Sequence, residues 1–140
     1  MKKILALVIL IYSVPAYCEV SVEDYCFASV GEKSVRFELR TYFDDSVKWS
    51  GAFVKYEKSK ELIPVVLESV KEDVTEEGRP AELTRKWLEI SGGAVTGEYE
   101  MTSQGANIES MSYKGYKNKK TFDFQFDANS QRTNSMGCNW

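Results

Sequence analysis

Histidine is absent from the 140 residues of this chain. Its absence removes the side chain that most often acts as a general base near neutral pH, the catalytic triads built on it, and most zinc sites. Three cysteines are present, and the two in the body of the chain, Cys26 and Cys138, lie too far apart for a zinc-ligand spacing. The sequence therefore predicts neither a metal ion nor another cofactor.

Motifs for other kinds of catalysis are missing as well. Acidic pairs occur at Asp44-Asp45 and at Glu76-Glu77, but adjacent side chains of a strand point to opposite faces, and such pairs in loops are usually solvated. No nucleophile motif surrounds a serine or a lysine, and no glycine-rich phosphate loop is present. We therefore predict a protein that is not an enzyme.

Long apolar runs are scarce. The clearest one, residues 4–12, follows Lys2 and Lys3 and is about half as long as the ~20 residues of a transmembrane helix. Two lysines, a short apolar run and then small residues are typical of a bacterial secretory signal peptide. We predict that residues 1–18 form this leader and that residues 19–140 form a single exported β-domain, periplasmic or secreted. No integral membrane segment is expected after the leader is removed.

The end of the leader allows more than one processing site. Cuts after Ala16 and after Cys18 both follow acceptable residues. A third alternative is a lipoprotein with a lipidated Cys18, although the bulky Tyr17 precedes it. The cut after Cys18 leaves Cys26 and Cys138 as an even pair, as expected in an oxidising compartment. A bridge between them would close most of the exported chain into one loop, which the chain-entropy model values at about 4–5 kcal/mol.

Basic residues are too few for a nucleic-acid-binding surface. Without Lys2 and Lys3 the chain keeps 16 basic and 21 acidic residues, a net charge of −5. This mild acidity argues against nucleic acid as a partner and is compatible with a basic protein partner.

Alternation of apolar and polar residues is the strongest pattern present, and it is clearest in residues 34–57. A period of two predicts half-buried β-strands, and Asp44-Asp45-Ser46 predicts a tight turn between two of them. Further alternating segments before and after this hairpin supply the additional strands that it needs. The sequence therefore predicts an all-β fold, a single antiparallel meander of about eight strands that closes into a small barrel. The alternative is a sandwich, and in both the disulfide joins the N- and C-terminal segments.

Three local features refine this prediction. Residues 62–74 carry apolar side chains at four-residue spacing, as on a helix face, but Pro64 and the many valines favour a strand. Gly51 interrupts the second strand of the hairpin and predicts a bulge or a bend. Phe122, Phe124 and Phe126 alternate with polar residues and predict one wall of the core.

Two connections carry candidate recognition residues. The turn at residues 103–107 is rich in amide and hydroxyl groups, so it is either a polar loop that inserts into a partner or ordinary hairpin chemistry. Residues 113–120 combine tyrosines with lysines, so they form either an adhesive surface, as tyrosine often does, or a solvated basic turn. The candidate partner-binding residues are Gln104, Asn107, Tyr113, Lys114, Tyr116 and Lys117.

A small exported β-barrel clasped by a disulfide resembles, in general build, the bacterial periplasmic inhibitors of lysozyme. The resemblance concerns build alone and transfers no site residue. With no catalytic motif present, it leads to the hypothesis of a non-enzymatic periplasmic protein that binds another protein. Such a protein would inhibit, or give immunity against, a cell-wall-degrading enzyme or toxin such as a lysozyme.

The alternative is a ligand-binding β-barrel that holds a small apolar molecule. This alternative requires that the aromatic side chains expected inside leave room for a ligand. Those side chains are Phe37, Trp49, Tyr99, Phe122, Phe124 and Phe126.

Overall fold

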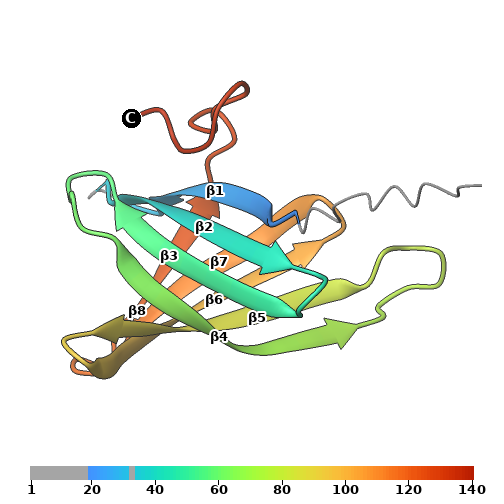
Figure 1. The fold of residues 1–140 in the computed structure, drawn as a ribbon, viewed down its shortest axis with the longest axis horizontal. Helices are drawn as coiled ribbons and strands as arrows, with labels where there is room; N and C mark the ends of the chain where they lie inside the picture. Colours follow the sequence, from blue (N-terminus) through green and yellow to red (C-terminus); the bar gives the residue numbers. More distant parts are fainter. Residues whose placement is uncertain (1–18, 32–33) are drawn as a thin grey trace, which may run out of the picture.

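Eight antiparallel strands follow one another around a closed barrel in the computed structural model, which describes residues 19–31 and 34–140 (Figure 1). The predicted leader, with Cys18 and both cleavage points, lies outside these residues. The predicted meander is confirmed, and its closed form is a barrel. The strands are β1 (Ser21–Ser29), β2 (Arg36–Asp44), β3 (Trp49–Tyr56), β4 (Ile63–Asp73), β5 (Glu82–Ser91), β6 (Ala94–Gln104), β7 (Asn107–Gly115) and β8 (Thr121–Phe126).

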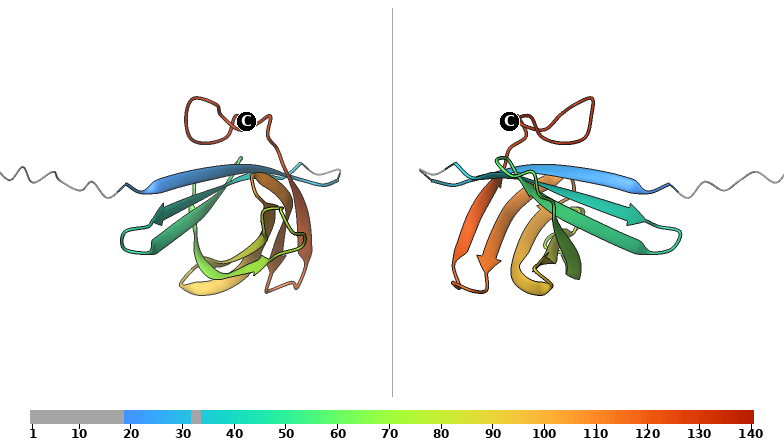
Figure 2. Two further views of the ribbon diagram at one scale, coloured as in Figure 1. Left: turned by 90° about the vertical axis from the view of Figure 1, so that its right-hand side faces the viewer. Right: turned by 60° about the vertical axis from the view of Figure 1, so that its left-hand side comes forward.

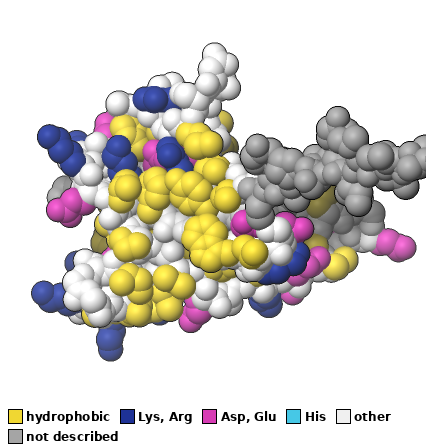
Figure 3. Space-filling view, viewed as in Figure 1, with side chains coloured by type: hydrophobic (Ala, Val, Ile, Leu, Met, Phe, Trp, Pro, Cys, Tyr) yellow, Lys and Arg dark blue, Asp and Glu magenta, His cyan; other side chains and the backbone are white. Residues whose placement is uncertain are grey.

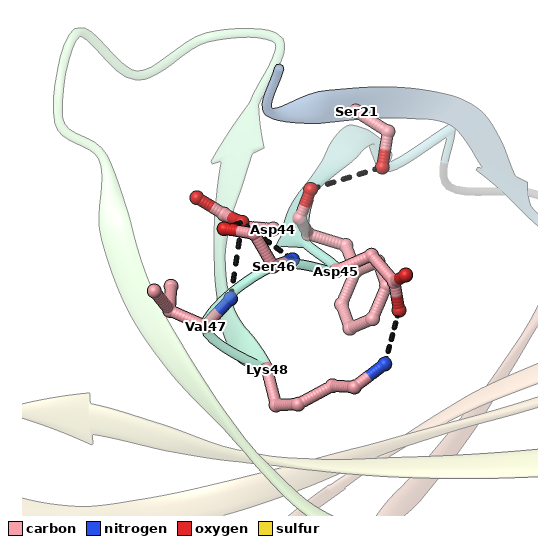
Figure 4. Close-up of polar contacts among 7 residues, drawn as sticks. Ser21, Asp44, Asp45, Ser46, Val47 and Lys48 are labelled. Carbon is pink, nitrogen blue, oxygen red and sulfur yellow. Dashed lines mark hydrogen bonds and ion pairs between the residues drawn. The ribbon is translucent and has the colours of Figure 1, made fainter. Parts of the chain in front are cut away.

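The predicted hairpin forms β2 and β3, and Asp44 fixes the turn between them (Figure 4). The Oδ1 atom of Asp44 accepts hydrogen bonds from the Ser46 hydroxyl at 2.6 Å and from the Ser46 N–H at 2.9 Å. A longer bond of 3.4 Å reaches it from the Val47 N–H. Lys48 closes the turn with a positive φ of 54°, and its ammonium group pairs with Asp45. An aspartate that binds the backbone two and three residues ahead is a typical turn former.

Gly51 does not form the predicted bulge, because β2 and β3 pair without interruption from Phe37–Tyr56 to Asp44–Trp49. The glycine instead makes room for an indole ring. A Cβ atom on Gly51 would lie 2.8 Å from Cη2 of Trp49, so only glycine lets this side chain lie across β3.

Most of residues 62–74 forms strand β4 (Ile63–Asp73) and not a helix, so the strand prediction is confirmed. Pro64 lies where β3 and β4 pair over only three residues, opposite Phe53. The missing N–H of proline is tolerated at such a short pairing. Within the described part of the chain, no helix is long and apolar enough to cross a membrane.

An aromatic cluster fills one half of the barrel interior. The Phe37 ring lies 5.2 Å from Phe27, 4.8 Å from Phe124 and 5.6 Å from Tyr99 between centroids, and all four side chains are buried. The predicted phenylalanine wall is right for Phe124 and for Phe126, which packs against this cluster. It is wrong for Phe122, which is 47% exposed at the rim.

The tail after β8 crosses the outer surface of β1 and is held there by the Cys26–Cys138 disulfide (Figures 1 and 2). The Gln131 side chain donates to the Asp24 carbonyl at 2.8 Å, and the Gly137 N–H donates to the Asp24 carboxylate. Both cysteines are buried, Cys26 on β1 and Cys138 in the tail itself. The predicted link between the N- and C-terminal segments is therefore confirmed.

Candidate functional site

The two ends of the barrel differ, and the difference begins in the strand pairing. We call the end with the β2–β3, β4–β5 and β6–β7 turns the open end, and the opposite end the closed end. Strands β3 and β4 pair over three residues near the closed end, after which β4 pairs with β5 alone. At the open end the β2–β3 hairpin therefore stays paired with β1 but stands away from β4 (Figure 2).

A second interruption lies on the other side of β1. Strand β8 pairs with β1 only at Phe27–Ser29 and with β7 only from Met111 to Lys114. The first half of β1 and the first half of β7 thus have no ladder to β8. At the open end, strand pairing is therefore interrupted on both sides of the sheet formed by β1, β2 and β3.

The open end contains a cavity of about 350 Å³, which we call the mouth cavity. Its size lies at the lower end of the range of about 300–1,000 Å³ found for small-molecule sites. Polar groups also reach it, chiefly Glu23, Tyr25 and Arg85. Its apolar wall is built from Phe43, Leu67, Val70, Trp87 and Met101.

Strand β5 places a cation inside the barrel. Arg85 pairs with Met101 of β6, which in turn pairs with Met111 of β7, and both methionines are buried in the core. Because side chains alternate along a strand, Arg85 shares the inward face with Trp87, two residues further on. The Arg85 Nη1 donates to the Ser103 hydroxyl at 3.3 Å, the one hydrogen bond of this guanidinium among the described residues.

Glu23, the acidic residue that lines the mouth cavity, already accepts a hydrogen bond. The Tyr25 hydroxyl donates to the Glu23 carboxylate at 2.7 Å. Burial, and after it the neighbouring Glu23 carboxylate, raises the pKa of the Tyr25 phenol, so the phenol stays protonated and remains a donor. Among the residues described, no ion pair joins Glu23 to Arg85.

A second hollow of about 430 Å³ opens beside the mouth cavity, between β1 and the start of β7. We call it the side cleft. Its lining includes Asp24, Ser103, Ile108 and Gln131, and it shares Glu23, Tyr25 and Arg85 with the mouth cavity. The Arg85 side chain therefore lies on the boundary between an apolar cavity and a polar cleft.

The closed end holds a buried carboxyl group that is fully hydrogen-bonded. Glu89 accepts from Thr96 at 2.6 Å, from Tyr99 at 2.9 Å and from Tyr113 at 3.1 Å. The Tyr56 and Tyr99 hydroxyls lie 2.9 Å apart. Burial raises the pKa of Tyr99 and of Tyr113, and the neighbouring Glu89 raises both further, so these phenols stay neutral donors. Such a network stabilises the fold and offers no activated nucleophile.

The structure divides the predicted partner-binding residues between the two ends of the barrel. Gln104 and Asn107 flank the β6–β7 turn at the open end, where the Gln104 amide donates to the Pro80 carbonyl at 3.1 Å. Tyr116 and Lys117 lie in the β7–β8 connection at the closed end.

Tyr113, Lys114 and Tyr116 of the predicted set contact two glutamates, Glu98 and Glu89. Tyr116 donates to Glu98 at 2.8 Å, and this bond is the main reason that the pKa of Glu98 is lowered. Lys114 lies 3.5 Å from the same carboxylate, whereas the Tyr113 hydroxyl points to Glu89 inside the barrel. The six residues do not form one surface, and their role in binding a partner stays a prediction.

Sequence reasoning missed Arg85 and Glu89, because charged residues are expected on the outer face of a strand. One signal was available: both lie two residues from Trp87, the largest apolar side chain of β5, and must share its face. A scan against models of known protein families, a search of curated proteins and a search of solved structures found no match for this chain.

Proposed function

We propose that this chain is a non-enzymatic, exported binding protein that holds a small apolar molecule in the mouth cavity. The observation that supports this proposal is the unequal filling of the barrel. The aromatic cluster occupies the closed half, while a cavity of about 350 Å³ with an apolar wall remains in the open half. The room that a ligand-binding barrel requires is therefore present.

The composition of the cavity wall supplies the driving force for binding. Burial of apolar surface contributes about 25 cal/mol per Å². Trp87 and Met101 form the floor of the cavity and are nearly inaccessible to water, so their positions are fixed before a ligand arrives. A pre-formed apolar site loses little conformational freedom on binding.

The test is a titration with decanol, followed by tryptophan fluorescence because Trp87 lines the cavity. Decanol is expected to bind and to change the emission. Ser50→Trp, which places a large side chain at the cavity, should weaken binding by about tenfold, since about 0.8 kcal/mol is lost for each methylene kept out of an apolar site.

Ser69→Trp is the matched control, because Ser69 is also exposed but lies opposite Lys86 on the outer face of β4, away from the cavity. It should leave the affinity for decanol unchanged. Absence of decanol binding, or equal weakening by both variants, would contradict the proposal.

Recognition of another protein is the second candidate function, and the rigid β2–β3 turn favours it. Val47 on the turn is 69% exposed, and Trp49 at the start of β3 is 53% exposed. The prediction that Trp49 lies inside the barrel is therefore wrong. Apolar side chains continue over the face formed by β2, β3 and β4 (Figure 3). Exposed aromatic anchors on a rigid support are typical of interface hot spots.

The proposed partner is a cell-wall-degrading enzyme such as a lysozyme, whose basic surface would suit an acidic chain. We expect the purified protein to slow lysis of bacterial cells by lysozyme. Trp49→Ser should abolish this protection, whereas Trp140→Ser, at an exposed tryptophan in the tail, should not. If no muramidase or amidase is inhibited by the unmodified protein, the second candidate is excluded.

A further inference from the structure

We infer that the ligand is an anionic amphiphile, a medium-chain carboxylate, whose acid group lies at Arg85 and whose chain lies in the mouth cavity. The inference rests on the proposed function and adds the chemical class of the ligand. Its starting point is the Arg85 guanidinium, which faces the barrel interior and makes one hydrogen bond within the described part of the chain, to Ser103.

The Arg85 guanidinium has N–H donors that remain available to a ligand. Arginine carries five N–H donors in a planar fork that matches the two oxygens of a carboxylate. The Ser103 hydroxyl, which is nearly buried, occupies one of them at 3.3 Å. A carboxylate beside Arg85 can therefore accept two parallel hydrogen bonds while the contact with Ser103 persists.

The place of Arg85 between the two hollows suits a molecule with a charged head and an apolar tail. On one side of the guanidinium lies the mouth cavity, with its wall of Leu67, Trp87 and Met101. On the other side lies the side cleft, which polar groups of Asp24, Ser103 and Gln131 line. A tail bound in the mouth cavity would thus leave its head on the polar side of the same arginine.

The charge balance of the mouth favours an anionic head over a cationic one. Of the residues that the structure describes, two charged ones, Glu23 and Arg85, line the mouth cavity. The Glu23 carboxylate already accepts the Tyr25 hydroxyl at 2.7 Å, and no ion pair joins it to Arg85 among the described residues. Asp24, the third charged group, lines the side cleft together with Glu23 and Arg85, and its carboxylate is bound by the Gly137 N–H from the tail. Of these three charged groups, Arg85 therefore keeps the most hydrogen-bonding capacity for a ligand.

The test compares three probes with the same ten-carbon tail, decanoate, decanol and decyltrimethylammonium, at one ionic strength and neutral pH. We expect decanoate to bind about tenfold more tightly than decanol, because a hydrogen-bonded charge pair in a partly buried site is worth about that factor. The cationic probe should bind more weakly than decanol. Arg85→Gln should make decanoate no tighter than decanol.

Arg79→Gln is the matched control, since Arg79 lies in the β4–β5 connection and pairs with Glu76 at 3.1 Å. It should keep the preference for decanoate. Glu23→Gln provides a second variant in case Arg85→Gln does not fold, and it should raise the preference for decanoate about threefold by removing the competing charge.

The outcomes separate the inference from the proposed function. If decanol binds but decanoate is not preferred, or if the preference survives Arg85→Gln or is lowered by Glu23→Gln, the anionic class is wrong and the apolar site remains. If none of the three probes binds, both the inference and the proposed function are wrong.

Discussion

Replacing Cys26 and Cys138 together by alanine is expected to lower the free energy of unfolding by about 4–5 kcal/mol. The bridge joins residues separated by 112 positions, so its removal restores the conformational freedom of nearly the whole described chain in the unfolded state. The loss would be a large fraction of the 5–15 kcal/mol that is common for a domain. Urea denaturation of the double variant and of the unmodified protein measures the difference.

The position of the bridge makes a second observable available. Cys26 directly precedes Phe27, where the three-residue pairing of β1 with β8 closes the barrel. Without the bridge, the backbone amides at this short pairing should exchange with solvent faster than those of the long β5–β6 pairing. A reductant should reproduce both effects in the unmodified protein. A loss of stability below about 1 kcal/mol would contradict the role given to the bridge.

Glu89→Ala is expected to destabilise the protein by about 3–5 kcal/mol. The change leaves three hydroxyls without their acceptor, that of the buried Tyr99 and those of the partly buried Thr96 and Tyr113. Each buried polar group that loses its partner costs about 1–3 kcal/mol, and neighbouring losses are not additive. Chemical denaturation followed by circular dichroism measures the change.

Two further variants test the cause of that loss. Glu89→Gln keeps one carbonyl acceptor, so it should lose about half as much stability as Glu89→Ala. Glu100→Ala removes an exposed carboxylate that pairs with Lys86 at 3.6 Å, and it should cost less than about 1 kcal/mol. If Glu89→Ala is no more harmful than Glu100→Ala, the buried network does not stabilise the closed end.

The strands and the disulfide could be predicted from the sequence because each leaves a local signal. Alternation with a period of two marks β2 and β3, and an even cysteine pair near the chain ends indicates the bridge. Asp44 also reveals its turn, since a short acidic side chain binds the next backbone groups directly.

The candidate site could not be predicted in the same way, because it depends on register and pairing length. Arg85 faces inward through its place opposite Met101, and this register is not visible in β5 alone. The mouth cavity exists because the β3–β4 pairing stops at Val65, a boundary set by how the barrel closes. Trp49 was expected inside, but Gly51 allows its ring to lie across β3.

Methyl-resolved NMR during a decanol titration tests most directly whether the open half of the barrel binds an apolar molecule. Leu67, Val70 and Met101 line the mouth cavity, so their methyl resonances should shift as decanol is added. Val95, near the β5–β6 turn at the closed end, should not move. Unchanged resonances at the three cavity residues, or shifts confined to the closed end, would show that the mouth cavity is not the binding site.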